Sequence, residues 1–95
     1  MFTSIATVAT AAPERYAKQL ASHLGRKTEV LPENAGPRIV LNAASCLLES
    51  VDGALVLHAT ADDADGLHRI EQVVGSHLER FGARDELTVS WEAGA

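Results

Sequence analysis

The fold of this chain is decided in its middle, by the stretch Cys46-Leu-Leu-Glu-Ser-Val-Asp-Gly-Ala-Leu-Val-Leu-His-Ala59. An Asp-Gly pair between two apolar runs favours a two-residue β-hairpin turn, because both central positions of that turn need positive φ. A turn at Asp52-Gly53 pairs Val51 with Ala54 and so sets the register of both strands. Alternation then divides the two strands into a core face and an outer face. The core face holds Cys46, Leu48, Leu55, Leu57 and Ala59, and the outer face holds Glu49 and His58.

Two amphipathic helices are predicted on either side of this hairpin. The first begins at Pro13, whose missing N–H costs nothing in a first helical turn, and ends at Gly25. The second starts from Asp62 as the N-cap and breaks at Gly82. Their apolar stripes follow three- and four-residue steps, and consist of Tyr16, Leu20 and Leu24 in the first helix and Leu67, Ile70, Val74, Leu78 and Phe81 in the second.

The remaining elements are short strands and turns. Besides the hairpin, strands are predicted over residues 4–10, 28–31, 38–42 and 87–92, with a turn over 32–37 and a connection over 43–45. In the last strand Leu87, Val89 and Trp91 face one way. The predicted fold is α+β, one domain over residues 1–95 in the order β-α-β-β-β-β-α-β. The simplest way to bury the apolar faces is an antiparallel-dominated sheet with the two helices packed on one face.

Composition excludes several classes of function. No apolar run approaches the roughly 20 residues that cross a bilayer, so no membrane association is predicted. The net charge of −5 argues against nucleic acid as a partner. The single cysteine suits a reducing cytoplasm, which is the predicted location. Residues 1–38 hold five Lys and Arg against three acids and residues 39–95 hold three against ten, an asymmetry that suits a homo-oligomer or two differently charged solvated faces.

A set of segments gives the chain a recognisable signature. They are Leu20-Ala-Ser-His-Leu-Gly-Arg-Lys27, Arg38-Ile39, Cys46-Leu-Leu-Glu49, Ala61-Asp-Asp-Ala-Asp65 and the tail from Ser76 to Trp91. Together they resemble the small bacterial family catalogued as domain of unknown function 2218. Members of that family stand alone or lie beside flavin-dependent, siderophore-interacting reductases. The resemblance therefore implies such a reductase as a partner and a link to siderophore-bound iron.

Two histidines and the cysteine form the candidate metal site. His23 and His77 each lie about 60–80° from the centre of the apolar stripe of their helix, so both border the core. If the helices pack side by side, the two imidazoles line one groove and Cys46 faces it from the sheet. Two His and one Cys are ligands for zinc or iron with an open position. The alternative is two boundary histidines bonded to backbone or carboxylate, with Cys46 as a small buried hydrophobe.

A basic set at the helix ends is the candidate anion- or partner-binding site. It consists of Lys27, His77, Arg80 and Arg84. The guanidinium fork suits carboxylate or phosphate, as in a ferric chelate or a flavin phosphate. The alternative is that these cations complement the helix dipole, or that the arginines pair with Glu79, Asp85 or Glu86.

No catalytic constellation is evident in the chain, and no cofactor is predicted apart from the metal ion of the alternative site. The acidic run Asp62, Asp63 and Asp65 is interpreted as helix capping. The sequence thus favours a non-catalytic binding or accessory module. Its alternatives are a small metalloprotein or enzyme using His23, His77 and Cys46, and a structural homo-oligomer without a ligand.

Overall fold

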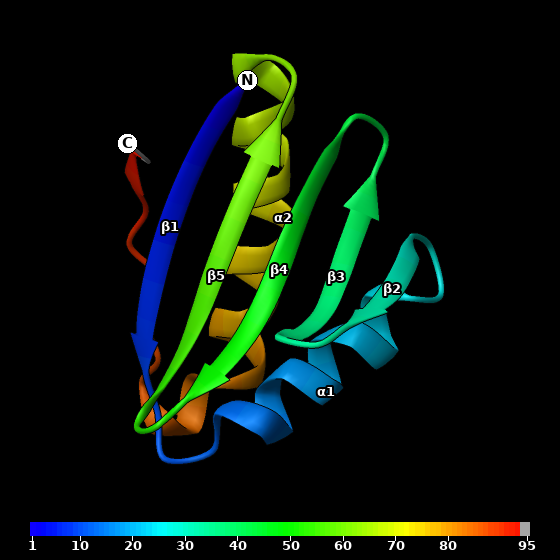
Figure 1. Ribbon diagram of the computed structural model, residues 1–95. Coiled ribbons are helices and arrows are strands. Elements are labelled where there is room, and N and C mark those ends of the chain that lie inside the picture. Colours follow the sequence, from blue (N-terminus) through cyan, green and yellow to red (C-terminus); the bar gives the residue numbers. More distant parts are fainter. Residues whose placement is uncertain (94–95) are drawn as a thin grey trace.

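A computed structural model of the protein describes residues 1–93 as one sheet with two helices packed against it (Figure 1). The elements in chain order are β1 (Phe2–Ala9), α1 (Pro13–Leu24), β2 (Glu29–Glu33), β3 (Gly36–Leu41), β4 (Ala44–Val51), β5 (Ala54–Ala61), α2 (Ala64–Phe81), the short 3₁₀ helix η1 (Ala83–Asp85) and β6 (Glu92–Ala93). The predicted α+β class and the order β-α-β-β-β-β-α-β are therefore confirmed.

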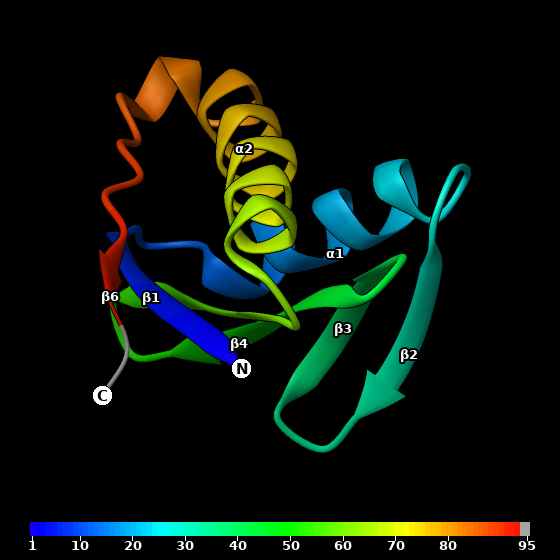
Figure 2. The same cartoon turned by 90° about the horizontal axis from the view of Figure 1, so that it is seen from above.

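The six strands lie in the order β2-β3-β4-β5-β1-β6, and every ladder between them is antiparallel. Both helices cover the same face of the sheet, α1 over β3 to β5 and α2 over β1, β4 and β5 (Figure 2). The opposite face carries no element from residues 1–93 (Figure 2). Neither helix in this part of the chain has the length and hydrophobicity required to span a membrane.

The register of the central hairpin is the predicted one. Val51 pairs with Ala54 and Leu48 with Leu57, and the five residues expected on the core face are all buried. One detail of the turn is wrong in the prediction: Gly53 has a φ of 76°, whereas Asp52 is not among the described non-glycine residues with positive φ. The strong glycine signal at one turn position, together with the flanking apolar runs, was sufficient to set the register.

The chain between α1 and β4 contains more strand than predicted. The turn expected over 32–37 is confined to residues 34 and 35, because Pro32 pairs with Pro37 and Glu33 with Gly36. The connection expected over 43–45 is likewise a tight turn at residues 42 and 43, where Asn42 adopts a φ of 56°. Asparagine tolerates this left-handed conformation, so β3 and β4 form a hairpin with a tighter turn than the predicted three-residue connection.

Both helices follow their apolar stripes. Leu20, Ile70, Val74 and Leu78 have no exposed surface and form the layer that meets the sheet. The N-cap of α2 was predicted one residue too early: the carboxylate of Asp63 accepts the backbone N–H of Gly66 at 2.6 Å, and Asp62 precedes it. Successive aspartates offer the same capping chemistry, so the sequence alone does not distinguish them.

The tail after α2 differs most from prediction. Instead of a strand over 87–92, only Glu92 and Ala93 pair with β1. The preceding residues pack on α2: the backbone N–H of Val89 donates to the Glu79 carboxylate at 2.9 Å, and Val89 and Trp91 lie against Gly75. The side chains point inward as expected, but a helix side chain takes the place of a strand partner, and the ladder with β1 is confined to Glu92 and Ala93.

Candidate functional site

The two candidate histidines meet at the contact between α1 and α2. The imidazole of His23, in the last turn of α1, has its centroid 5.1 Å from that of His77 on α2, with the ring planes inclined by 45°. Phe81 completes the group, its ring 5.3 Å from His23 and 6.3 Å from His77. We call these three residues the helix seam. The structure therefore brings the two imidazoles side by side at the contact between the helices.

The seam exists because both histidines border the apolar stripes that drive the helices together. His23 is exposed and His77 is half-buried, while Leu24 and Leu78 beside them are buried. His77 Nδ1 lies 2.6 Å from the backbone carbonyl oxygen of Val73. A carbonyl oxygen only accepts, so Nδ1 carries the proton and donates it. In the neutral imidazole the lone pair then lies on the other ring nitrogen, Nε2.

Cys46 does not join the two histidines. It lies on the inner face of β4, as predicted, but is fully buried. Burial raises the pKa of its thiol to about 12, against the smaller opposing effects of the Arg38 charge and a backbone hydrogen bond from His58. Within residues 1–93, no three His, Cys, Asp or Glu side chains come together closely enough to hold a metal ion. The three-ligand site of His23, His77 and Cys46 is therefore not assembled.

The basic set is spread along the helix layer: η1 contacts the first turn of α1 through Asp85 and Tyr16, whereas Lys27 follows the last turn of α1. Lys27 lies in the turn that follows α1, Arg80 in the last turn of α2 and Arg84 in η1, and all three are exposed. None of the three forms an ion pair with another described residue. His77, the fourth member, neighbours Arg80 at a spacing of three residues along α2.

Two of the three acids considered as partners for these cations are engaged elsewhere, and the third, Glu86, forms no ion pair with a described residue. Glu79 accepts the backbone N–H of Val89. Asp85 accepts the hydroxyl of the buried Tyr16 and lies 3.9 Å from Arg15. The described residues therefore do not form the alternative arrangement, in which neighbouring acids neutralise Arg80 and Arg84.

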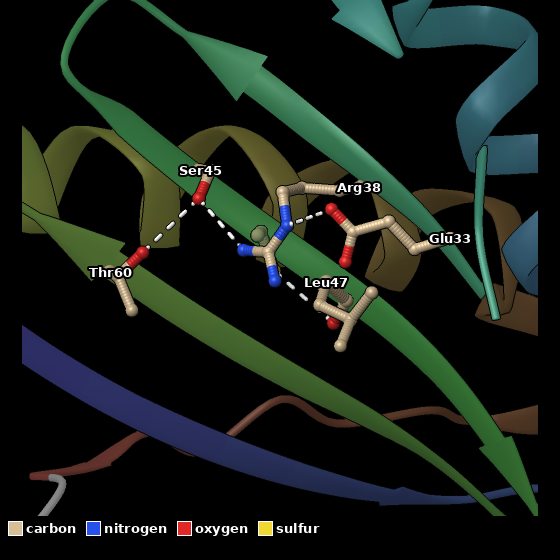
Figure 3. Close-up of polar contacts among 6 residues, drawn as sticks. Glu33, Arg38, Ser45, Leu47 and Thr60 are labelled. Carbon is tan, nitrogen blue, oxygen red and sulfur yellow. Dashed lines mark hydrogen bonds and ion pairs between the residues drawn. The ribbon is translucent and has the colours of Figure 1, made fainter. Parts of the chain in front are cut away.

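A polar chain on the uncovered face of the sheet was missed by the sequence analysis (Figure 3). Arg38 Nε donates to Glu33 Oε2 at 2.7 Å, and its Nη1 donates to Ser45 Oγ at 3.0 Å. Ser45 in turn lies 3.1 Å from the Thr60 hydroxyl, so the chain crosses β2, β3, β4 and β5. The charge of Arg38 is balanced by Glu33, which makes the chain a cross-strand brace and not an anion site. The sequence signal that could have predicted this chain is strand alternation, which places Arg38 on the outer face of the sheet.

A second missed feature is a hollow of about 600 Å³ between the start of β1, α2 and β6. Trp91 forms part of its wall, and Glu71 lies inside it with Oε2 accepting the hydroxyl of Ser4 at 2.6 Å. The hollow is open to solvent, and the bond to Ser4 satisfies one oxygen of the only carboxylate on its α2 side.

These features define the class of the protein: a two-layer α+β domain with an imidazole pair where its helices meet and exposed cations at the helix ends. The chain belongs to the family described as uncharacterised protein conserved in bacteria, domain of unknown function 2218, whose family model matches residues 5–92. This confirms the resemblance drawn from the sequence. The structure is similar to the NMR structure of PA4090 from Pseudomonas aeruginosa, with a TM-score of 0.80 and 28% identity over 97% of this chain and 96% of that chain. Comparison with curated proteins gives no match.

Proposed function

We propose that this protein is a non-catalytic binding or accessory module that receives an anionic ligand at the helix ends. The observation that carries the proposal is that Lys27, Arg80 and Arg84 are exposed and have no ion pair among the described residues. Exposed charges without partners attract an anion from solution, and the guanidinium fork favours carboxylate or phosphate groups.

Helix-dipole stabilisation accounts for part of this arrangement only. A cation in the last turn of a helix gains about 0.3–1 kcal/mol from the negative end of the dipole, which covers Arg80. Lys27 lies beyond the end of α1 and Arg84 lies in the separate η1 helix. The dipole of α2 therefore does not account for Lys27 and Arg84, whose charges have no ion-pair partner among the described residues and are available to an anionic ligand.

The ligand class that we propose is a carboxylate-rich ferric chelate or the phosphate of a flavin. This follows from the association of the family with flavin-dependent, siderophore-interacting reductases, one of which would be the protein partner. The proposal includes a cytoplasmic location, where such a reductase has its cofactors and where the buried free thiol of Cys46 stays reduced.

The test is a thermal-shift titration of the purified protein with ferric chelates, the same chelates without iron, flavin mononucleotide and simple polyanions. A ligand at about 100 times its dissociation constant adds about 2.7 kcal/mol, which raises the melting temperature of a domain of this size by several degrees. The Arg80→Ala/Arg84→Ala variant is expected to lose that shift.

The matched control is Lys18→Ala/Arg69→Ala, which removes the same charge from exposed positions on α1 and α2 away from the seam. It is expected to keep the shift. Equal losses of the thermal shift in both variants would mean that binding depends on net charge alone, which would contradict the proposed site. A mass that rises with concentration and no response to any ligand would favour the alternative of a structural homo-oligomer.

A further inference from the structure

The seam offers a second chemistry that needs no third protein ligand. We propose that His23 and His77 together bind one divalent metal ion of the kind that prefers imidazole, with Zn²⁺ as the reference ion, and leave its other positions open to water or an added ligand. Imidazole nitrogen suits Zn²⁺, Cu²⁺ and Ni²⁺, whereas carboxylate oxygen suits Mg²⁺ and Ca²⁺. The inference stands apart from the proposed anion binding, because it rests on the two imidazoles alone.

The spacing of the rings carries the argument. A ring nitrogen lies about 1.1 Å from the centre of an imidazole, and a Zn–N bond is about 2.0–2.1 Å, so a bound ion lies about 3.2 Å from each centroid. At the tetrahedral angle of about 109°, two such centroids are about 5.2 Å apart, whereas a square-planar angle of about 90° brings them to about 4.5 Å. The observed separation between the centroids of His23 and His77 is 5.1 Å, close to the tetrahedral value and also within the range of packed rings.

The hydrogen bond of His77 supplies an independent observation. Metal-binding histidines almost always donate their second ring N–H to a carboxylate or a backbone carbonyl, which sets the tautomer and the ring orientation. His77 Nδ1 makes such a bond to the Val73 carbonyl oxygen at 2.6 Å, and the lone pair of Nε2 is left for an ion. Phe81 packs against both rings and limits their rotation.

The charge around the two imidazoles determines which further ligands a bound ion would take. No third His, Cys, Asp or Glu within residues 1–93 completes the site. Arg80 follows His77 at a neighbouring helix position and repels a bare dication while attracting an anionic ligand of that ion. The open positions therefore suit carboxylate or phosphate oxygens supplied from solution.

The rival explanation is that the three rings pack as aromatic groups and bind nothing. Isothermal titration with ZnCl₂ alone separates the two, supported by Co²⁺, whose visible absorption reports tetrahedral coordination. We expect one equivalent of Zn²⁺ per chain, and binding about tenfold or more weaker in His23→Ala, which changes an exposed side chain and should fold normally. His77→Gln, which keeps a polar side chain of similar size, should show the same loss.

Two controls make the outcome decisive. His68→Ala removes an exposed histidine from the same helix and should leave Zn²⁺ affinity unchanged. Arg80→Ala/Arg84→Ala should bind Zn²⁺ at least as tightly as the wild type, because it removes nearby cations. No Zn²⁺ binding, or equal losses in His68→Ala and His23→Ala, would overturn the inference. A thiolate-to-Co²⁺ charge-transfer band would also overturn it, since that band requires Cys46 as a ligand.

Discussion

Cys46 gives the structure its sharpest quantitative test. Its thiol is fully buried on the inner face of β4, and burial raises its pKa from 9.0 to about 12. The folded protein therefore holds the thiol proton more tightly than the unfolded chain does. A group of this kind contributes stability below its unfolded pKa, and that stability is lost as the pH rises from 9.0 towards 12.

The size of the loss follows from the two pKa values. Between about pH 8 and about pH 10 the thiol of the unfolded chain changes from mostly protonated to mostly ionised, while the folded thiol stays protonated. Each pKa unit corresponds to about 1.36 kcal/mol, so the Cys46 contribution to the free energy of unfolding falls by about 1.4 kcal/mol over that interval.

The assay is urea unfolding at several pH values for the wild type and Cys46→Ala, followed by the fluorescence of Trp91, the only tryptophan. Loss of the sulfur lowers the stability of the variant by an amount that does not change with pH. Lysine and tyrosine ionisations are common to both proteins and cancel in the difference. We expect the wild type to lose about 1.4 kcal/mol more than the variant between about pH 8 and about pH 10. Parallel pH profiles would refute the argument that burial controls this thiol.

The remaining predictions concern the turns and the tail. Gly36→Ala places a Cβ 1.9 Å from the Leu48 carbonyl oxygen at a φ of 149°, and should cost about 3 kcal/mol or more in urea unfolding. Gly53→Ala, with a φ of 76° and open space around its Cβ, should cost only about 1–2 kcal/mol, and equal costs would contradict the close approach at Gly36. Tyr16→Phe removes the hydrogen bond that holds η1 through Asp85 and should cost about 1 kcal/mol. In an Asp85→Ala background Tyr16→Phe should have almost no further effect, and an undiminished cost there would show that the hydroxyl acts elsewhere.

Local patterns in the sequence were sufficient for most of the fold. The Asp-Gly turn and the alternation around it determined which hairpin residues face the core, because a slip of one residue would expose Leu48 and Leu57 together. The stripes of α1 and α2 determined which helix faces are buried, because leucine and isoleucine at helical spacing have no other way to leave water.

Short turns and the tail were less predictable. The hairpin turn at Asn42 contains no glycine, although Asn42 adopts a left-handed conformation. The sequence there therefore does not distinguish a tight turn from a longer loop. The tail alternates apolar residues as a strand does, but its Val89 N–H bonds to Glu79 of α2 and not to β1. Alternation reports which side chains are buried and carries no information about which backbone partner is used.

The candidate site separates the two sources of information most clearly. The sequence by itself determined that His23 and His77 border the apolar faces of two helices and that Cys46 lies on the inner side of a strand, since periodicity sets the direction of each side chain. Only the tertiary structure decided that the centroids of the two imidazoles lie 5.1 Å apart, that Cys46 is buried away from them, and that Lys27, Arg80 and Arg84 have no acidic partner among residues 1–93. Those outcomes depend on where the helices meet on the sheet, which is set by packing between residues far apart in the chain.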